Sequence, residues 1–140
     1  MPSNAFSGVG TSFKRSDMNS SASFTAIAEV NSITGPNKTR ETIDVTSLDS
    51  EGGYREFIAS FRDAGTVELE MNFTRAGYED LNTDFETETL VDYQIVLPDT
   101  GNTTLDFAGL VVDLGMAVPL DNKVTATVTI KISGQVTLTT

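Results

Sequence analysis

The stretch Thr66-Val67-Glu68-Leu69-Glu70-Met71-Asn72-Phe73 decides the expected fold of this chain. Its apolar side chains alternate with polar ones at every position, which is the period of a β-strand with one buried and one solvated face. A shift of one residue would bury both glutamates, so the register of the strand is firmly specified. Such amphipathic strands are typical of antiparallel sheets, because strands of parallel sheets are apolar on both faces.

Segments on both sides of this stretch show similar alternation and are expected to be strands. They are residues 23–30, 42–48, 90–97, 104–112, 124–132 and 136–138, with a weaker strand signal at 11–15. One helix is expected to begin at Thr74 or Arg75, because Tyr78, Leu81 and Phe85 follow helical spacing. The fold class is therefore mainly β: an antiparallel β-sandwich or barrel with one flanking α-helix.

The length and charge of the chain restrict its organisation and its partners. We expect a single domain over residues 1–140, with a flexible N-terminal arm over 1–10 and a long loop over about 33–61. The net charge is -11, which disfavours binding to a phosphate backbone or to an anionic membrane surface. No apolar run approaches the roughly 20 residues of a membrane span. The N-terminal residues lack the features of a signal peptide, so cytoplasmic synthesis is expected.

The residue types argue against catalysis and metal binding. Histidine and cysteine are both absent, which removes the usual general base, the thiolate nucleophile and the commonest metal ligands. Glu68 and Glu70 share a strand face, and Asp80, Asp84 and Glu88 share a helix face. We interpret both sets as solvated surfaces, since calcium prefers six to eight oxygens from a wrapping loop. No enzyme activity, metal or cofactor is expected.

The long loop over about 33–61 combines charges with many large apolar residues. Helical spacing, i, i+3, i+4 and i+7, is shown by Tyr54, Phe57, Ile58 and Phe61. This spacing predicts one or two helical turns within the loop. Long loops in compact domains usually carry function or are disordered. Two interpretations stay open: the apolar residues pack on their own domain, or they become ordered against a neighbouring chain.

The chain resembles the tail tube (major tail) proteins of long-tailed, non-contractile bacteriophages of the lambda-like type. Residues 39–50 and 54–67 carry the resemblance, followed by the strand at 68–73, the helix at 78–85 and the closing pattern over 109–111, 118–124 and 133–134. The likeness extends over roughly residues 10 to 135. It is a pattern over the whole chain and not one catalytic signature.

This resemblance implies a fold that is shared with the inner tubes of contractile tails and with type VI secretion tubes. It also implies that six copies form a ring, that the rings stack into a hollow tube in the virion, and that DNA passes through the bore. Expected partners are further copies of the chain, the tape measure protein, the tail terminator and the tail-tip initiator. The resemblance places the long loop, mobile in the free subunit, at contacts between subunits through Ile43, Val45, Leu48, Tyr54, Phe57, Ile58 and Phe61.

The acidic character would then suit the bore of the tube, where DNA meets like charge and slides. The candidates for this bore surface lie on polar strand faces and are Thr25, Glu29, Glu68 and Glu70. Two alternative functions are a subunit of a type VI secretion-like tube and a non-catalytic β-sandwich binding module. The chain lacks tryptophan and its three tyrosines are scattered, which disfavours a carbohydrate-binding surface.

Overall fold

The computed structural model describes the fold of residues 5, 7–17, 20–27 and 29–139. Its strands are β1 (Ser12–Asp17), β2 (Ser20–Ala26), β3 (Val30–Thr34), β4 (Thr39–Asp44), β5 (Phe57–Asp63), β6 (Thr66–Asn72), β7 (Val91–Val96), β8 (Thr104–Ala117) and β9 (Thr125–Thr139). One α-helix, α1, spans Arg75–Glu86, and a short 3-10 turn spans Glu51–Gly53. The residues at 1–4 and 6, which belong to the predicted N-terminal arm, lie outside the described part.

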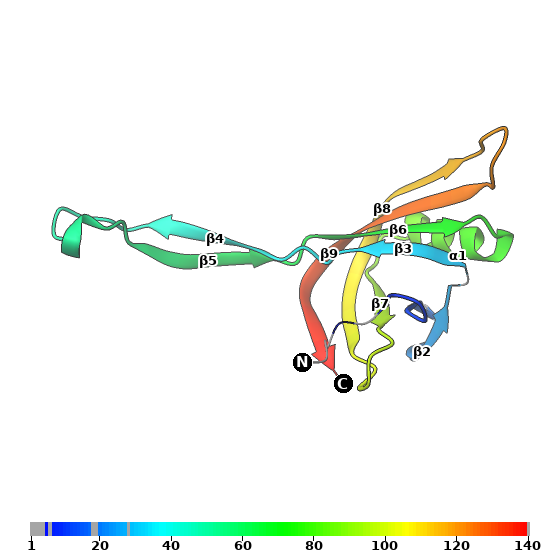
Figure 1. Ribbon diagram of the computed structural model, residues 1–140, viewed down its shortest axis with the longest axis horizontal. Helices are drawn as coiled ribbons and strands as arrows, with labels where there is room; N and C mark the ends of the chain where they lie inside the picture. Colours follow the sequence, from blue (N-terminus) through cyan, green and yellow to red (C-terminus); the bar gives the residue numbers. More distant parts are fainter. Residues whose placement is uncertain (1–4, 6, 18–19, 28, 140) are drawn as a thin grey trace.

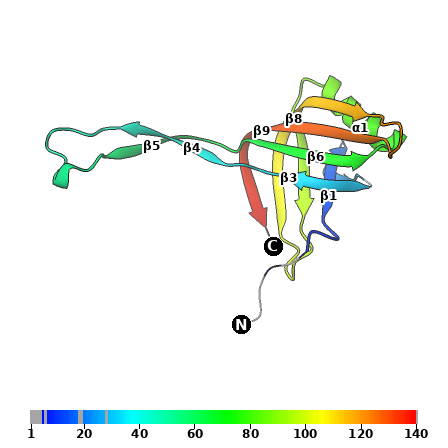
Figure 2. The same ribbon diagram turned by 45° about the horizontal axis from the view of Figure 1, so that its top comes forward.

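Seven strands form one antiparallel sheet in the order β2-β1-β7-β8-β9-β6-β3. The sheet curls on itself, and α1 lies at one end of it beside β8 (Figures 1 and 2). Strands β4 and β5 form a separate two-stranded sheet that projects from the curled sheet as a long hairpin (Figure 1). The predicted fold class is confirmed: the architecture is mainly β, antiparallel and barrel-like, with one flanking helix.

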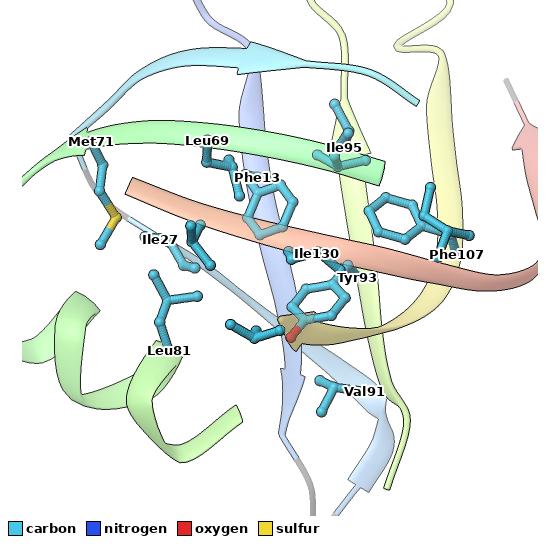
Figure 3. Packing of buried hydrophobic residues seen from close by; sticks show 14 of the residues in the cluster. Phe13, Ile27, Leu69, Met71, Leu81, Val91, Tyr93, Ile95, Phe107 and Ile130 are labelled. Atoms are coloured by element: carbon cyan, nitrogen blue, oxygen red, sulfur yellow. The ribbon is translucent and has the colours of Figure 1, made fainter. Parts of the chain in front are cut away.

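The core fills the inside of the curl. Every second residue is buried there in β6 and in the first half of β9, up to Ile132, which follows from the strand period of two. The aromatic rings of Phe13, Tyr93 and Phe107 stack in a row, with centroid separations of 5.5 and 5.8 Å (Figure 3). Leu81 of α1 is fully buried and faces this cluster. Apolar burial of this kind contributes most of the stability of a small domain.

The helix was predicted almost to its ends. Thr74 is the N-cap, and its hydroxyl oxygen accepts a hydrogen bond of 3.2 Å from the backbone N–H of Gly77. A Cβ atom on Gly77 would lie 2.8 Å from that same hydroxyl oxygen. The glycine therefore lowers helix propensity but leaves space for the cap that begins the helix.

Two local predictions are wrong. Segment 54–61 is not helical: β5 covers Phe57–Asp63 and pairs with β4, so the predicted loop contains two strands and not one. Segment 23–30 is not one strand, because β2 ends at Ala26 and β3 begins at Val30. Glu29 between them has a φ of 59°, a left-handed conformation that interrupts an extended strand.

Candidate functional site: a projecting hairpin and an acidic sheet face

The hairpin β4–β5 has a defined register and an ordered tip. Ile43 pairs with Ile58 across the two strands. At the tip, the backbone N–H of Val45 donates to the carbonyl of Glu56 at 2.9 Å, and the N–H of Glu56 donates to Thr46 Oγ1 at 2.7 Å. Ser50 Oγ donates to Glu56 Oε2 at 2.8 Å. These bonds satisfy the polar groups of the turn locally, so the tip has a specific conformation within the single chain.

The hairpin exposes large apolar side chains along its whole length. Leu48 at the tip is fully exposed, and Phe61 near the base is 84% exposed. Ile43 and Ile58 lie on one face, whereas Phe57 points to the other, because successive strand residues alternate. All seven residues that were predicted to contact other subunits are on this hairpin and exposed: Ile43, Val45, Leu48, Tyr54, Phe57, Ile58 and Phe61. The interpretation that they pack on their own domain is therefore wrong.

Two glycines hold the root of the hairpin against the body. Gly35 has a φ of +106°, and a Cβ there would lie 2.4 Å from the carbonyl oxygen of Thr66. Gly65 has a φ of +81°, and a Cβ there would lie 2.3 Å from the carbonyl oxygen of Asn37. Any other residue would be strained and would clash with backbone at both positions. The root is therefore a close backbone crossing that sets the direction of the hairpin.

An ion pair adds to this root. Lys131 Nζ on β9 donates to both carboxylate oxygens of Asp63 at 3.1 Å. The backbone N–H of Gly65, and to a smaller extent Lys131, hold the pKa of Asp63 below its ordinary value. Beside this pair, an open groove of about 700 Å³ lies between the base of the hairpin and the C-terminal half of β9. The groove is lined by both apolar and cationic side chains, among them Arg40, Phe61 and Arg62.

A second surface is the polar face of the sheet. Glu68 and Glu70 of β6 are exposed on the side opposite the core. Glu68 lies between Thr34 of β3 and Thr129 of β9, and Glu70 lies next to Thr127. Carboxylates and hydroxyls therefore line up across neighbouring strands. The face is acidic and hydrogen-bonding, without large apolar side chains on β6.

The two other predicted bore residues lie outside β6, and one of them adjoins this face. Thr25 lies on β2 at the opposite edge of the sheet, and its side chain is outside the described part. Glu29 lies in the connection between β2 and β3, where its carboxylate accepts a hydrogen bond of 3.4 Å from Asn72 Nδ2. Asn72 follows Glu68 and Glu70 on the polar side of β6, so the structure brings Glu29 to the end of this face and places only Thr25 elsewhere.

One predicted solvated surface contains a buried group that sequence reasoning missed. Asp84 is 1% exposed and accepts hydrogen bonds from Arg15 Nε at 2.9 Å and from the Tyr93 hydroxyl at 3.0 Å. The Arg15 pKa is raised, chiefly by this bond to Asp84, and burial raises the pKa of Tyr93. The position of Asp84 three residues after Leu81, on the apolar side of the helix, was the signal. This network ties α1 to β1 and β7.

The described residues contain no group of three acidic side chains arranged to hold a metal ion. Among the helices in the described part, none is long and apolar enough to cross a membrane. The distinctive features are instead two surfaces: the projecting apolar hairpin and the acidic sheet face.

Comparison with solved structures gives several tail components with the same fold. The tail of an empty GTA particle with C6 symmetry has a TM-score of 0.80 at 23% identity, and the match covers 97% of this chain and 100% of that one. The virion of a native gene transfer agent gives 0.77 at 21% identity, with coverage of 97% and 100%. The SPP1 tail tube gives 0.67 at 8% identity, with coverage of 91% and 75%.

A search of curated proteins gives no match. The family model described as "Lambda phage tail tube protein, TTP" matches residues 4–139, which is nearly the whole chain. This match favours a tube subunit over a β-sandwich binding module. The chain therefore belongs to the family of lambda phage tail tube proteins, and it is a structural subunit of a tail tube.

Proposed function

We propose that this subunit assembles into rings of six copies, and that the rings stack into a hollow virion tube through contacts of the β4–β5 hairpin. One observation carries the proposal: an ordered hairpin exposes apolar side chains on both faces, Ile58 on one and Phe57 on the other. Exposed apolar surfaces of this kind mark sites of protein association. Because a hairpin and its docking surface are different patches, the contact is head-to-tail, which generates rings and stacks.

The edges of the sheet support the same assembly. Strands β2 and β3 each have one neighbour in the seven-stranded sheet. Free edges invite pairing with other chains, and natural sheets cover them. We propose that neighbouring copies in a ring cover these edges, so that the curled sheets join around a central bore. The C6 symmetry of the structurally similar GTA tail is consistent with a ring of six.

The polar face of β6 is our candidate for the wall of the bore. Glu68 and Glu70 would present like charge to the phosphates of DNA, so the DNA would pass without sticking. Charge reversal of both residues to lysine should then slow the ejection of DNA from assembled particles. A Glu79→Lys/Asp121→Lys variant changes the net charge equally at exposed positions that lie outside both β6 and the hairpin. If the two variants eject DNA at equal rates, Glu68 and Glu70 do not line the bore.

The remaining parts of the proposal concern partners and activity. We propose a single domain that has no catalytic activity, is made in the host cytoplasm and becomes part of the virion. The long segment over about 33–61 would serve assembly. The tape measure protein would occupy the bore during assembly, and a tail-tip initiator and a tail terminator would contact the two ends of the tube.

Removal of the hairpin tip tests the assembly proposal. In the test variant, residues 45–56 are replaced by a two-residue Asn-Gly turn, which joins Asp44 of β4 directly to its cross-strand partner Phe57 of β5. The seven-stranded sheet and the core are untouched, so the variant should fold with the circular dichroism spectrum of a β-protein. Negative-stain electron microscopy of the concentrated wild-type protein should show hollow tubes, and the variant should show none. Tubes of normal appearance from the variant would contradict the role of the hairpin tip and restrict the contact to the paired strands.

A further inference from the structure

Two arginines face each other at the root of the hairpin. Arg40 of β4 and Arg62 of β5 are direct cross-strand partners, beside a bulge between Arg40 and Thr42. Like charges placed opposite each other destabilise a strand pair. Both residues are exposed, and among the described residues neither forms an ion pair, whereas Arg55 on the same hairpin pairs with Asp44. The pair is therefore an uncompensated positive site in a chain of net charge -11.

The two arginines also line the open groove of about 700 Å³. Lys38 adds a third cation to the same wall, and Phe61 and Val136 add apolar surface. Phe61 is 84% exposed, so the groove has an uncovered apolar side next to its cations. An occupant that fits this groove carries carboxylates flanked by apolar side chains.

The end of α1 has the complementary pattern. Glu86 is the last residue of the helix and Glu88 follows it, and both are exposed. Two acids at the negative end of a helix dipole are unfavourable, and the last turn has no basic residue to offset them. Phe85 and Leu90, which flank the glutamates, are 44% and 50% exposed. Among the described residues, neither glutamate forms an ion pair.

We propose that the groove beside Arg40 and Arg62 binds the segment 85–90 of a second copy, with Glu86 and Glu88 paired to the two arginines. The contact rests on the proposed function, since it requires that the chain self-assembles. In the single chain, the two arginines repel each other, and the two glutamates are repelled by the negative end of the helix dipole. Pairing the arginines with the glutamates reduces both repulsions. It also covers Phe61 with apolar side chains of the same segment.

A second copy suits this groove better than the phosphates of DNA. The chain carries 20 acidic and 9 basic residues, so two copies repel each other overall, and a basic groove selects the orientation in which they can meet. The net charge of -11 disfavours nucleic acid as the occupant. Phosphates would also leave Phe61 and the apolar wall of the groove uncovered.

Charge exchange tests the pairing. Three variants are compared with the wild type: Arg40→Glu/Arg62→Glu, Glu86→Arg/Glu88→Arg, and the combination of all four changes in one chain. The combined variant has the net charge of the wild type, so its behaviour does not depend on total charge. Circular dichroism and thermal unfolding establish that each variant is folded. The critical concentration for tube formation is measured by sedimentation and confirmed by negative-stain electron microscopy.

The critical concentration should rise by about tenfold or more in each double variant, because like charges then face each other. The combined variant should return to within about threefold of the wild type. Wild-type tubes together with unchanged double variants would overturn this pairing but leave the assembly proposal standing. The same holds if the combined variant does not recover. If the wild type forms no tubes at any concentration while remaining folded, the assembly proposal itself is contradicted.

Discussion

The Tyr93 hydroxyl donates a hydrogen bond of 3.0 Å to the Asp84 carboxylate in the interior of the protein. Arg15 forms an ion pair with the same carboxylate, and its side chain is only 11% exposed. Side chains from two neighbouring strands, Arg15 of β1 and Tyr93 of β7, thus converge on one residue of α1. Since a buried charge without a partner is costly, this network fixes the helix in a single position on the sheet.

We predict that Asp84→Asn lowers the free energy of unfolding by about 3 kcal/mol, because it leaves the buried Arg15 charge without its partner. Asp80 is the matched control: it lies 3.9 Å from the same arginine but its side chain is 50% exposed. Asp80→Asn should change the free energy of unfolding by less than about 1 kcal/mol. Urea unfolding measures both. Equal effects of the two substitutions would contradict the structural role of the buried network.

The root glycine Gly65 gives a second stability prediction. Gly65→Ala should lower the free energy of unfolding by about 2–3 kcal/mol, because the new Cβ is strained at this φ and also clashes with Asn37. Gly53→Ala is the control, since Gly53 has a φ of +74° but open space around its Cβ position. Its cost should be about 1 kcal/mol, from backbone strain alone. If urea unfolding gives the same loss for both, the close crossing at the root is absent.

A substitution at Phe61 should impair tube assembly without lowering the stability of the fold. We predict that Phe61→Ser changes the free energy of unfolding by no more than about 0.5 kcal/mol, because the side chain is 84% exposed. The same substitution should strongly reduce tube formation. Leu69→Ala is the opposite case: Leu69 is 4% exposed, so its truncation should cost about 3 kcal/mol of stability. At temperatures where that variant is folded, tubes should still form.

Sedimentation and unfolding measurements on the same samples distinguish these effects. A loss of tubes in both variants in proportion to their stability would mean that assembly depends only on folding. A stable Phe61→Ser variant that assembles normally would remove this residue from the interface.

The free energy of unfolding at acidic pH should depend on the ionisation of Asp63. Its pKa is lowered in the folded state, so the ionised form stabilises the fold at pH values above the unfolded pKa of about 4. That stabilisation is lost as the pH falls through the lower folded pKa. The unfolding free energies of the wild type and of Asp63→Asn should therefore converge below pH 4. A difference between them that is independent of pH would exclude ionisation of Asp63 as its cause.

The parts of the fold that were predictable are those where one face of an element is buried. Strand β6 and helix α1 each meet a core on one side only, so their polar and apolar residues alternate with the period of the element. The alternation over residues 66–73 therefore predicted β6, and the helical spacing of Tyr78, Leu81 and Phe85 predicted α1. Tertiary contacts then placed them without changing their conformation.

The hairpin was misread because it is apolar on both faces. Phe57 and Ile58 are adjacent and point to opposite sides, so with Tyr54 and Phe61 they reproduce helical spacing in a strand. Periodicity does not distinguish a two-faced strand from a short helix. The pairing of Arg40 with Arg62 was equally inaccessible, since it depends on the bulge that sets the register of the hairpin. The residues proposed for subunit contacts came from the family resemblance and not from periodicity.

Cryo-electron microscopy of assembled tubes tests the central claim most directly. We predict six-fold rings, with Phe57, Ile58 and Phe61 of each hairpin buried between neighbouring copies and with Glu68 and Glu70 on the wall of the bore. Tubes in which the hairpin stands free in solvent, while other surfaces form every contact between subunits, would contradict the account.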